Sequence, residues 1–308
     1  MPVPPHSFAL DGERLSYARF EKSGGRFTVT AFRSVVLPPD LFHEGLLGGT
    51  LKDARQLQEI LAGFLAQLPA VPKAASLVLP DAWLRIAFTE AGELPASGKA
   101  REDMLRFKLK RLVPFRVDEL RIRGAEIEPL ERQAEPGRLF LGFALETLLT
   151  QLEETFAAKG VALGQITNVS LAVLGALEPS ENDDLRALAV VAPQGYSLVF
   201  ARGGVPMVAR YKPLVEELSP EAQAAMIRRD LKLTRTFVDE QLPGGTFPAV
   251  LLSAPSGSEL PWSHWLAEGL EAPVETVALS HLPPLSGASD LDLARVAPLL
   301  GAASLEVA

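Results

Sequence analysis

The predicted secondary structure of this chain repeats the same order twice, and this repeat constrains the fold more than any other feature. In the first half, apolar and polar residues alternate between turn residues and predict three strands, a helix and a buried strand, at 8–10, 15–20, 26–36, 53–68 and 75–79. The second half begins with three strands and a long helix, followed by alternating strands and helices, at 185–192, 197–201, 205–211, 220–241, 249–253, 262–269, 274–277 and 291–300. This repeated order predicts an α/β protein with two structurally duplicated lobes.

A second set of elements interrupts the first half. Three strands and a helix are predicted there, at 84–88, 120–127, 139–145 and 97–112, followed by a helix at 146–159. We therefore predict a first lobe formed by residues 1–80 and 146–184, with a small inserted α/β subdomain at 81–145. The second lobe would contain residues 185–290, and a closing helix at 291–308 would pack on the first lobe.

Composition excludes several classes of function. The 308 residues include no cysteine, so disulfides, thiolate metal sites and cysteine nucleophiles are excluded. A net charge of −8 argues against bulk electrostatic binding of nucleic acid. We expect neither a secretory signal nor a membrane span, and hence a cytoplasmic protein.

Catalytic motifs are missing from the sequence. No GxSxG, HExxH, GxGxxG or GxxxxGK[ST] pattern occurs, and nothing singles out a pair of carboxylates for acid–base work. Asp11 could be a Mg²⁺ ligand or a turn residue, because Asp-Gly stands between two strands. We predict no catalytic residue, no cofactor and no metal site.

Basic residues concentrate in one segment. Residues 99–123 contain nine lysines and arginines and four acidic residues, a net charge of +5. The segment could be an ordinary solvated helix face. It could also meet a partner peptide or an anionic lipid surface, with about 1 kcal/mol per cation near an acidic leaflet. We take five of its cations as candidate partner-binding residues: Arg101, Arg106, Lys108, Lys110 and Arg111.

Four stretches of the chain resemble the type IV pilus assembly PilM family and its type II secretion counterpart, the cytoplasmic domain of GspL. They are LSYARFEKSGGRFTVTAFRSVVLP, LVLPDAWLRIAFTE, REDMLRFKLKRLVPFRVDEL and LDLARVAPLLGAAS, beginning at residues 15, 77, 101 and 291. The resemblance implies an actin-like, ribonuclease H-like bilobed fold similar to that of FtsA. The insertion would lie in the first lobe, and the second-lobe insertion would be reduced.

The first of the family's nucleotide-binding turns is altered in this chain. In ATP-binding members an Ile-Asp-Ile-Gly turn provides an aspartate for the metal and a glycine for the phosphate. Without gaps, Ala9 falls at that aspartate and Asp11 at that glycine. An acidic side chain facing a polyphosphate would repel it.

The other two turns are altered as well. Val190 and Ala192 fall at the aspartate and glycine of the second phosphate turn, and the next residue, Pro193, has no N–H to offer a phosphate. The adenosine turn, Ser-Gly-Gly-Gly in the family, aligns with Ser253–Gly257, where side chains would obstruct the base. The resemblance therefore implies a pseudo-ATPase.

In the family, the insertion helps to form a groove for the short cytoplasmic N-terminal peptide of PilN, a single-span membrane protein. The resemblance thus implies a non-catalytic cytoplasmic scaffold of a type IV pilus or type II secretion assembly, peripheral at the inner membrane. A homo-oligomer is left open, and nucleic acid is not an expected partner. One alternative is an ATP-binding ATPase of the same machinery with atypical phosphate turns, in which a two-residue shift makes Asp11 the metal ligand. A sugar- or acid-kinase relative of the same superfamily is another.

Overall fold

The computed structural model of the chain describes residues 5–45, 48–92, 94–96, 98–127, 137–178, 185–215, 217–242 and 245–304. The chain forms two compact units. The larger unit contains residues 1–37, 72–81 and 162–308, and the smaller unit contains residues 38–71 and 82–161.

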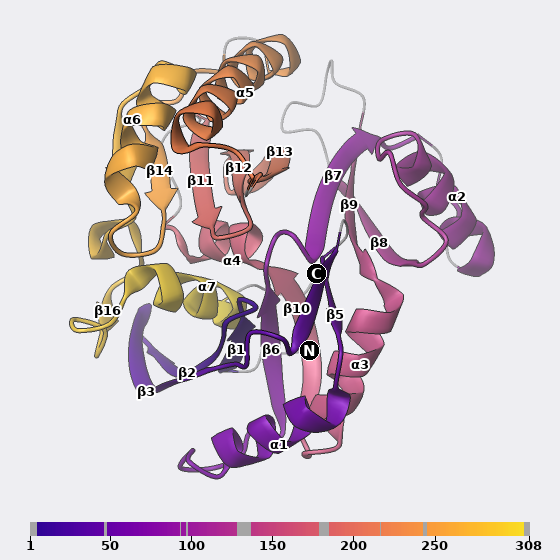
Figure 1. The fold of residues 1–308 in the computed structure, drawn as a ribbon, viewed down its shortest axis with the longest axis vertical. Coiled ribbons are helices and arrows are strands. Elements are labelled where there is room, and N and C mark those ends of the chain that lie inside the picture. The colour runs from indigo at the N-terminus through magenta and orange to yellow at the C-terminus, as the bar shows by residue number, and fades with distance from the viewer. Residues whose placement is uncertain are drawn as a thin grey trace. The chain divides into compact units, whose positions relative to one another are not determined.

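Two β-sheets form the framework of the larger unit (Figure 1). The first sheet contains β1 (His6–Leu10), β2 (Arg14–Ser23), β3 (Arg26–Val36), β6 (Ala74–Leu79), β10 (Ala162–Asn168) and β16 (Leu285–Ser286). The second sheet contains β11 (Arg186–Ala192), β12 (Gly195–Arg202), β13 (Val205–Pro213), β14 (Val250–Ser253) and β15 (Val274–Thr276).

The strand order of the two sheets confirms the predicted duplication. The first sheet has the order β3-β2-β1-β6-β10, with β16 added beside β3, and the second has the order β13-β12-β11-β14-β15. In each sheet three strands pair antiparallel and the next two pair parallel. The chain is therefore a duplicated α/β protein.

Helices α4 (Val169–Ala176) and α7 (Leu293–Ser304) share one apolar cluster with both sheets. The two helices approach closely at Gly301, where an added Cβ would collide with the backbone of Ala172. Helix α7 also contacts β1, β2 and β6 of the first sheet. A glycine at this crossing thus lets two backbones meet where a larger residue would hold them apart.

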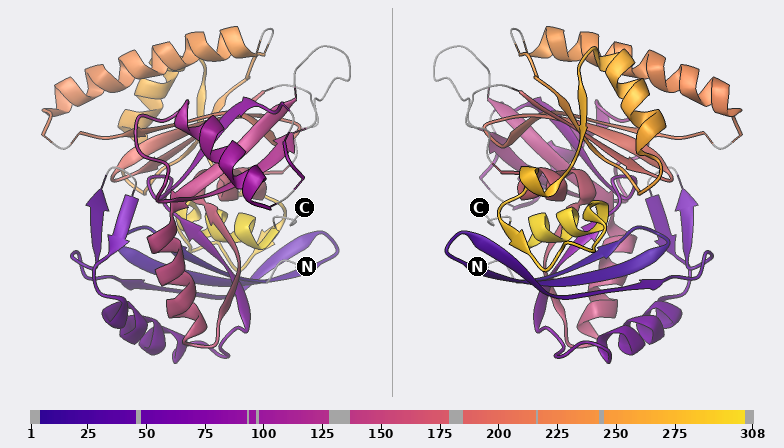
Figure 2. Two further views of the ribbon diagram at one scale, coloured as in Figure 1. Left: turned by 90° about the vertical axis from the view of Figure 1, so that its right-hand side faces the viewer. Right: turned by 90° about the vertical axis from the view of Figure 1, so that its left-hand side faces the viewer.

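Helices α5 (Pro220–Gln241) and α6 (Glu259–Leu270) pack on the second sheet (Figure 2). Ser219 caps α5 by accepting a hydrogen bond from the N–H of Ala222, and Pro220 occupies its first turn. Helix α5 begins only a few residues after β13, and the described residues between the two elements form no helix. The described residues thus contain no inserted helix between β13 and α5, and a reduced second-lobe insertion stays a prediction. A single 3₁₀ turn, η1 (Leu279–His281), follows β15.

The described residues of the smaller unit form a three-stranded sheet of order β7-β9-β8, a two-stranded hairpin β4-β5 and three helices. Their bounds are β4 (Phe42–Gly45), β5 (Gly48–Leu51), α1 (Ala54–Leu65), β7 (Leu84–Glu90), α2 (Gly98–Lys110), β8 (Leu120–Ile127), β9 (Arg138–Leu145) and α3 (Glu146–Ala157). Leu105 and Leu109 of α2 are buried against the three-stranded sheet. Helix α1 contacts α3 within this unit.

The predicted strands and helices correspond to observed elements. Among the described residues, the sequence did not predict β4, β5, β10, β16, α4 or the 3₁₀ turn η1. Helix α4 is apolar around its whole circumference because the core surrounds it, so it has no amphipathic period to detect. Strand β10 includes a glycine and three polar residues and has no clear alternation. The predicted lobe boundaries follow topology, whereas the compact units place α1 and α3 with the insertion, and those boundaries stay a prediction.

Candidate functional site

Asp11 lies in the turn between β1 and β2, at the first candidate phosphate turn. Its carboxylate accepts hydrogen bonds from the backbone N–H groups of Glu13 at 3.0 Å and Arg14 at 2.6 Å. The side chain is half-buried, and this burial raises the pKa of the carboxyl, while the two backbone hydrogen bonds and the charge of Arg295 on α7 oppose the rise. Asp11 is therefore a turn residue that uses its carboxylate within the turn.

The second candidate phosphate turn is a two-residue hairpin, in which Pro193 and Gln194 join β11 to β12. The carbonyl of Gln194 accepts hydrogen bonds from the N–H of Leu214 at 2.9 Å and from the Tyr211 hydroxyl at 3.3 Å. A Cβ added at Gly195 would collide with the backbone carbonyl of Lys212 and come within 2.8 Å of the Tyr211 ring. The glycine beside this turn thus lets the neighbouring strand β13 approach closely.

The third turn follows β14 and is also closed by its own groups. The N–H of Gly257 donates to the Glu259 carboxylate at 2.7 Å, and the N–H of Ser258 donates to the carbonyl of Pro255 at 3.1 Å. Gly257 has a φ of 92°, which favours glycine. The two backbone donors are therefore occupied within the turn.

Asp81 is a buried carboxylate that the sequence reading did not single out. It follows β6, and its oxygens accept hydrogen bonds from the hydroxyl of Ser170 at 2.7 Å and from the N–H of Ser170 at 3.3 Å. Burial raises the pKa of Asp81 to about 6, although hydrogen bonds from Ser170 and from Ser197 of β12 favour the charged form. The group joins the end of a first-sheet strand to α4 and to the second sheet. The sequence pattern that could have pointed to this residue is an aspartate directly after the Leu-Pro at the end of a buried strand.

The structure uses three of the five predicted partner-binding cations to hold the smaller unit together. Arg101 donates to the carbonyls of Pro95 and Gly124, at 3.1 and 3.3 Å. Arg106 donates to the carbonyl of Val117 at 2.9 Å. Lys108 donates to the carbonyl of Glu90, the last residue of β7, at 2.9 Å. These three side chains tie α2 to the chain around it.

Another cation of the basic segment is neutralised by α3. Arg121 contacts Glu146 at 2.6 Å and Glu153 at 2.7 Å, and only 20% of its side chain is exposed. The guanidinium lowers the pKa of Glu146 through its hydrogen bonds. The excess of positive charge counted in the sequence is thus partly cancelled in three dimensions.

Lys110 and Arg111, at the C-terminal end of α2, are exposed and form no ion pair within the part of the chain that the structure describes. Phe107 lies on the same helix face, and Leu112 follows directly; 60% of Phe107 and 44% of Leu112 is exposed. We call these four residues the α2-end patch. It presents two cations beside two large apolar side chains, which suits a peptide better than a small metabolite.

Two further kinds of feature would bear on function: clusters of metal-ligating side chains and membrane-spanning helices. Over the described ranges, no three side chains of the ligating types come together as a metal site. No helix in those same ranges is long and apolar enough to cross a membrane.

Comparison with solved structures identifies the fold. No protein-family model matches the sequence, and none of the curated proteins is significantly similar. A chain of the PilM-PilN type IV pilus biogenesis complex is 17% identical, with a TM-score of 0.74 over 98% of this chain and 97% of the other. A Bacteroides thetaiotaomicron protein with actin-like ATPase fold and unknown function is 9% identical, with a TM-score of 0.54 over 96% and 94%. The chain has the actin-like ATPase fold.

The cytoplasmic domain of EpsL, an inner membrane component of the Vibrio cholerae type II secretion system, is also similar. It is 12% identical, with a TM-score of 0.50 over 98% of this chain and 95% of that one. These comparisons confirm the expected fold class. In this actin-like chain, N–H donors of the first and third turns aligned with nucleotide contacts are bound by the chain's own oxygen atoms, and the second turn begins with a proline.

Proposed function

We propose that the protein is a non-catalytic scaffold of a type IV pilus or type II secretion assembly, and that it binds the cytoplasmic tail of a PilN-like membrane protein. The supporting observation is the near-complete coverage and the TM-score of 0.74 with the PilM-PilN complex. The likeness to the EpsL domain supports the wider class of machinery.

The non-catalytic part of the proposal rests on the three turns. A nucleotide needs backbone N–H donors and open space at its phosphates. Here the Asp11 carboxylate occupies two N–H groups of the first turn, and two donors of the third are bound to Glu259 and Pro255. The second turn begins with Pro193, which has no N–H to offer a phosphate. The first and third turns would have to give up hydrogen bonds before these donors could bind ATP.

The α2-end patch is the proposed contact for the tail. Of the five cations expected from the sequence, Arg101, Arg106 and Lys108 donate to backbone carbonyls, whereas Lys110 and Arg111 are exposed and have no side-chain partner among the described residues. An acidic or polar tail with one apolar anchor would pair its carboxylates with them and cover Phe107 and Leu112, which are already exposed. Arg101, Arg106 and Lys108 would support this surface by holding α2 in place.

Titration calorimetry tests the two parts separately. One titration uses Mg·ATP, and the other uses the N-terminal cytoplasmic peptide of a PilN-like protein encoded near this chain. Saturable heat with the peptide and none with Mg·ATP is the expected result. Micromolar binding of Mg·ATP would instead favour the ATPase alternative.

Charge reversal locates the contact. Lys110→Glu with Arg111→Glu should weaken peptide binding about tenfold or more, because two attractions become repulsions. The matched control is Lys52→Glu with Lys73→Glu, which makes the same change of charge at two exposed lysines elsewhere. Equal affinity in both double variants would place the tail on another surface.

The same tail would hold the protein at the inner membrane from the cytoplasmic side. Flotation with vesicles that carry the membrane partner, compared with empty anionic vesicles, separates tethering by the partner from direct lipid binding. Light scattering of the purified chain at several concentrations measures whether it forms an oligomer.

A further inference from the structure

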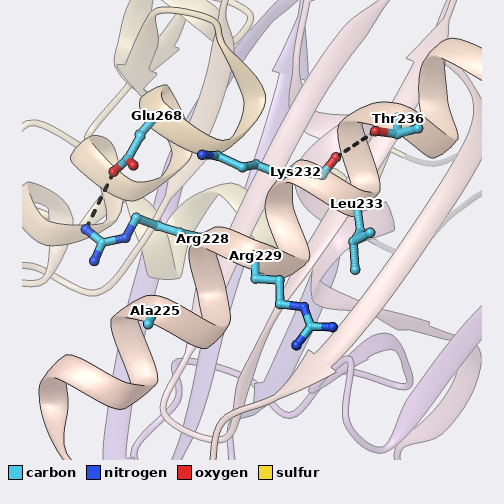
Figure 3. A pocket seen from close by; sticks show the side chains of 7 residues that line it. All are labelled: Ala225, Arg228, Arg229, Lys232, Leu233, Thr236 and Glu268. Carbon is cyan, nitrogen blue, oxygen red and sulfur yellow. Dashed lines mark hydrogen bonds and ion pairs between the residues drawn. The ribbon is translucent and has the colours of Figure 1, made fainter.

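The middle of helix α5 carries a second exposed surface that the proposed function does not use. Its residues lie at helical spacing on the side away from the second sheet, and together with Glu268 of α6 they line a hollow of about 440 Å³ (Figure 3). The lining residues are Ala225, Arg228, Arg229, Lys232, Leu233, Thr236 and Glu268. We call this the α5 hollow.

The cations of the α5 hollow differ in their partners. Arg228 forms an ion pair with Glu268 at 3.5 Å, which fixes the wall between α5 and α6. Arg229 and Lys232 are exposed, and neither has an ion-pair or hydrogen-bond partner for its side chain among the described residues. Two full positive charges are therefore available to a ligand.

Apolar surface adjoins these free cations. Leu233 is 56% exposed, and Phe237, four residues further along α5 on the same face as Leu233, is 39% exposed. In Figure 3 the Lys232 side chain extends toward α6, whereas Arg229 and Leu233 leave the helix on its other side. The Thr236 hydroxyl donates a hydrogen bond to the backbone carbonyl of Lys232 at 3.2 Å and forms no hydrogen bond with the side chains of Arg229 and Lys232. The hollow thus offers positive charge next to an aliphatic contact.

A nucleotide or free phosphate suits this surface poorly. In the middle of a helix the backbone N–H groups are already bound within the helix, so none is available to a phosphate as it would be at a helix start. The lining also contains no aromatic ring on which a base could stack.

A membrane suits it poorly as well. Helix α5 contains four basic and four acidic residues in the sequence PEAQAAMIRRDLKLTRTFVDEQ, so it has no net charge. Exposed acids stand at both ends, Glu221 at the start and Asp239 and Glu240 at the finish. These acids would face an anionic leaflet if the helix lay on it, and Arg229 and Lys232 alone would contribute only about 2 kcal/mol.

We propose that the α5 hollow is a docking site for an acidic amphipathic helix of a protein partner. Its carboxylates would pair with Arg229 and Lys232, and an aliphatic residue one turn away would cover Leu233. Charge complementarity supports the assignment. Arg229 and Lys232 attract carboxylates locally, although the net charge of the whole chain is −8. The exposed acids at both ends of α5 would repel an extended anionic surface, whereas a short acidic helix could contact the two cations between them.

The test measures binding of a synthetic probe to the full chain by fluorescence anisotropy. The probe is a labelled helical peptide that repeats Leu-Glu-Glu-Leu, and its control has glutamine in place of every glutamate. The chain variants are Arg229→Glu with Lys232→Glu, and Leu233→Ala. Arg26→Glu with Lys73→Glu serves as the matched control, because both residues are exposed and lie far from α5 in the sequence.

We expect saturable binding of the glutamate peptide and at least tenfold weaker binding of the glutamine peptide. The Arg229→Glu, Lys232→Glu variant should lose at least tenfold in affinity, Leu233→Ala a few-fold, and the matched control should bind as the parent does. Absence of saturable binding would overturn the proposal, as would equal loss in both double variants. Flotation with phosphatidylglycerol vesicles that depends on Arg229 and Lys232, without peptide binding, would also overturn it and assign the surface to lipid.

Discussion

Replacing Asp81 by asparagine is expected to stabilise the protein at neutral pH and to leave its stability unchanged in acid. The substitution keeps the size of the side chain and removes a charge that burial disfavours. Burial raises the pKa of Asp81 from 3.8 to about 6. At 1.36 kcal/mol per pKa unit, the ionised carboxylate therefore costs the folded state about 3 kcal/mol.

The sign of the pH dependence follows from the two ionisation states. Above about pH 6 the carboxylate is charged in both the folded and the unfolded chain, so the whole penalty is present. Below the unfolded pKa near 3.8 it is neutral in both, and the penalty is gone. The stability advantage of Asp81→Asn should thus be about 3 kcal/mol at pH 7.5 and fall toward zero as the pH approaches 4.

Urea denaturation followed by tryptophan fluorescence, at a series of pH values from 4.5 to 8, measures this difference for parent and variant side by side. Asp103→Asn is the control, because Asp103 is exposed on α2 and its replacement should give a difference near zero at every pH. The reasoning is refuted if Asp81→Asn is less stable than the parent at pH 7.5 by an amount that does not vary with pH. The hydrogen bonds from Ser170 would then outweigh the burial of the charge.

Three further substitutions test contacts within the fold. Gly301→Ala should destabilise the chain by about 3 kcal/mol or prevent folding, because its Cβ would enter the backbone of Ala172; thermal unfolding by circular dichroism measures the loss. Asp230→Asn should cost about 2 kcal/mol, because it leaves the Lys212 ammonium, 2.6 Å away, without its ion pair, and a result within error of the parent in urea would contradict this. Arg121→Met should leave two carboxylates of α3 unpaired and lower stability by about 1–2 kcal/mol, and high salt should reduce the difference between variant and parent.

The basic segment shows how far sequence alone carries a site prediction. Net charge over residues 99–123 was countable, and the segment did form the helix and strand expected of it. The sequence did not show which of these cations would lack a hydrogen-bond or ion-pair partner in the folded chain. The carbonyls that bind Arg106 and Lys108 come from residues 117 and 90, on other parts of the chain, so only folding showed that these side chains are occupied.

Asp81 and the α5 hollow lay beyond sequence analysis for the same reason. The partner of Asp81 is Ser170, 89 positions away on a helix that has no amphipathic period, and a carboxylate becomes unusual only once its surroundings exclude water. The α5 pattern predicted a helix, but periodicity does not tell which exposed cations find a counter-charge on α6.

The sequence by itself determined most of the strands and helices and the duplication, because alternation, helical period and turn residues act over short distances along the chain. Tertiary structure alone decided that the Tyr211 hydroxyl donates to the carbonyl of Gln194 and that three cations of α2 donate to carbonyls elsewhere in the smaller unit. It also decided that Arg229 and Lys232 have no partner among the described residues. Each of these depends on which distant groups come within hydrogen-bonding distance, and hydrogen bonds and ion pairs are decided at separations of a few ångströms that one-dimensional patterns do not encode.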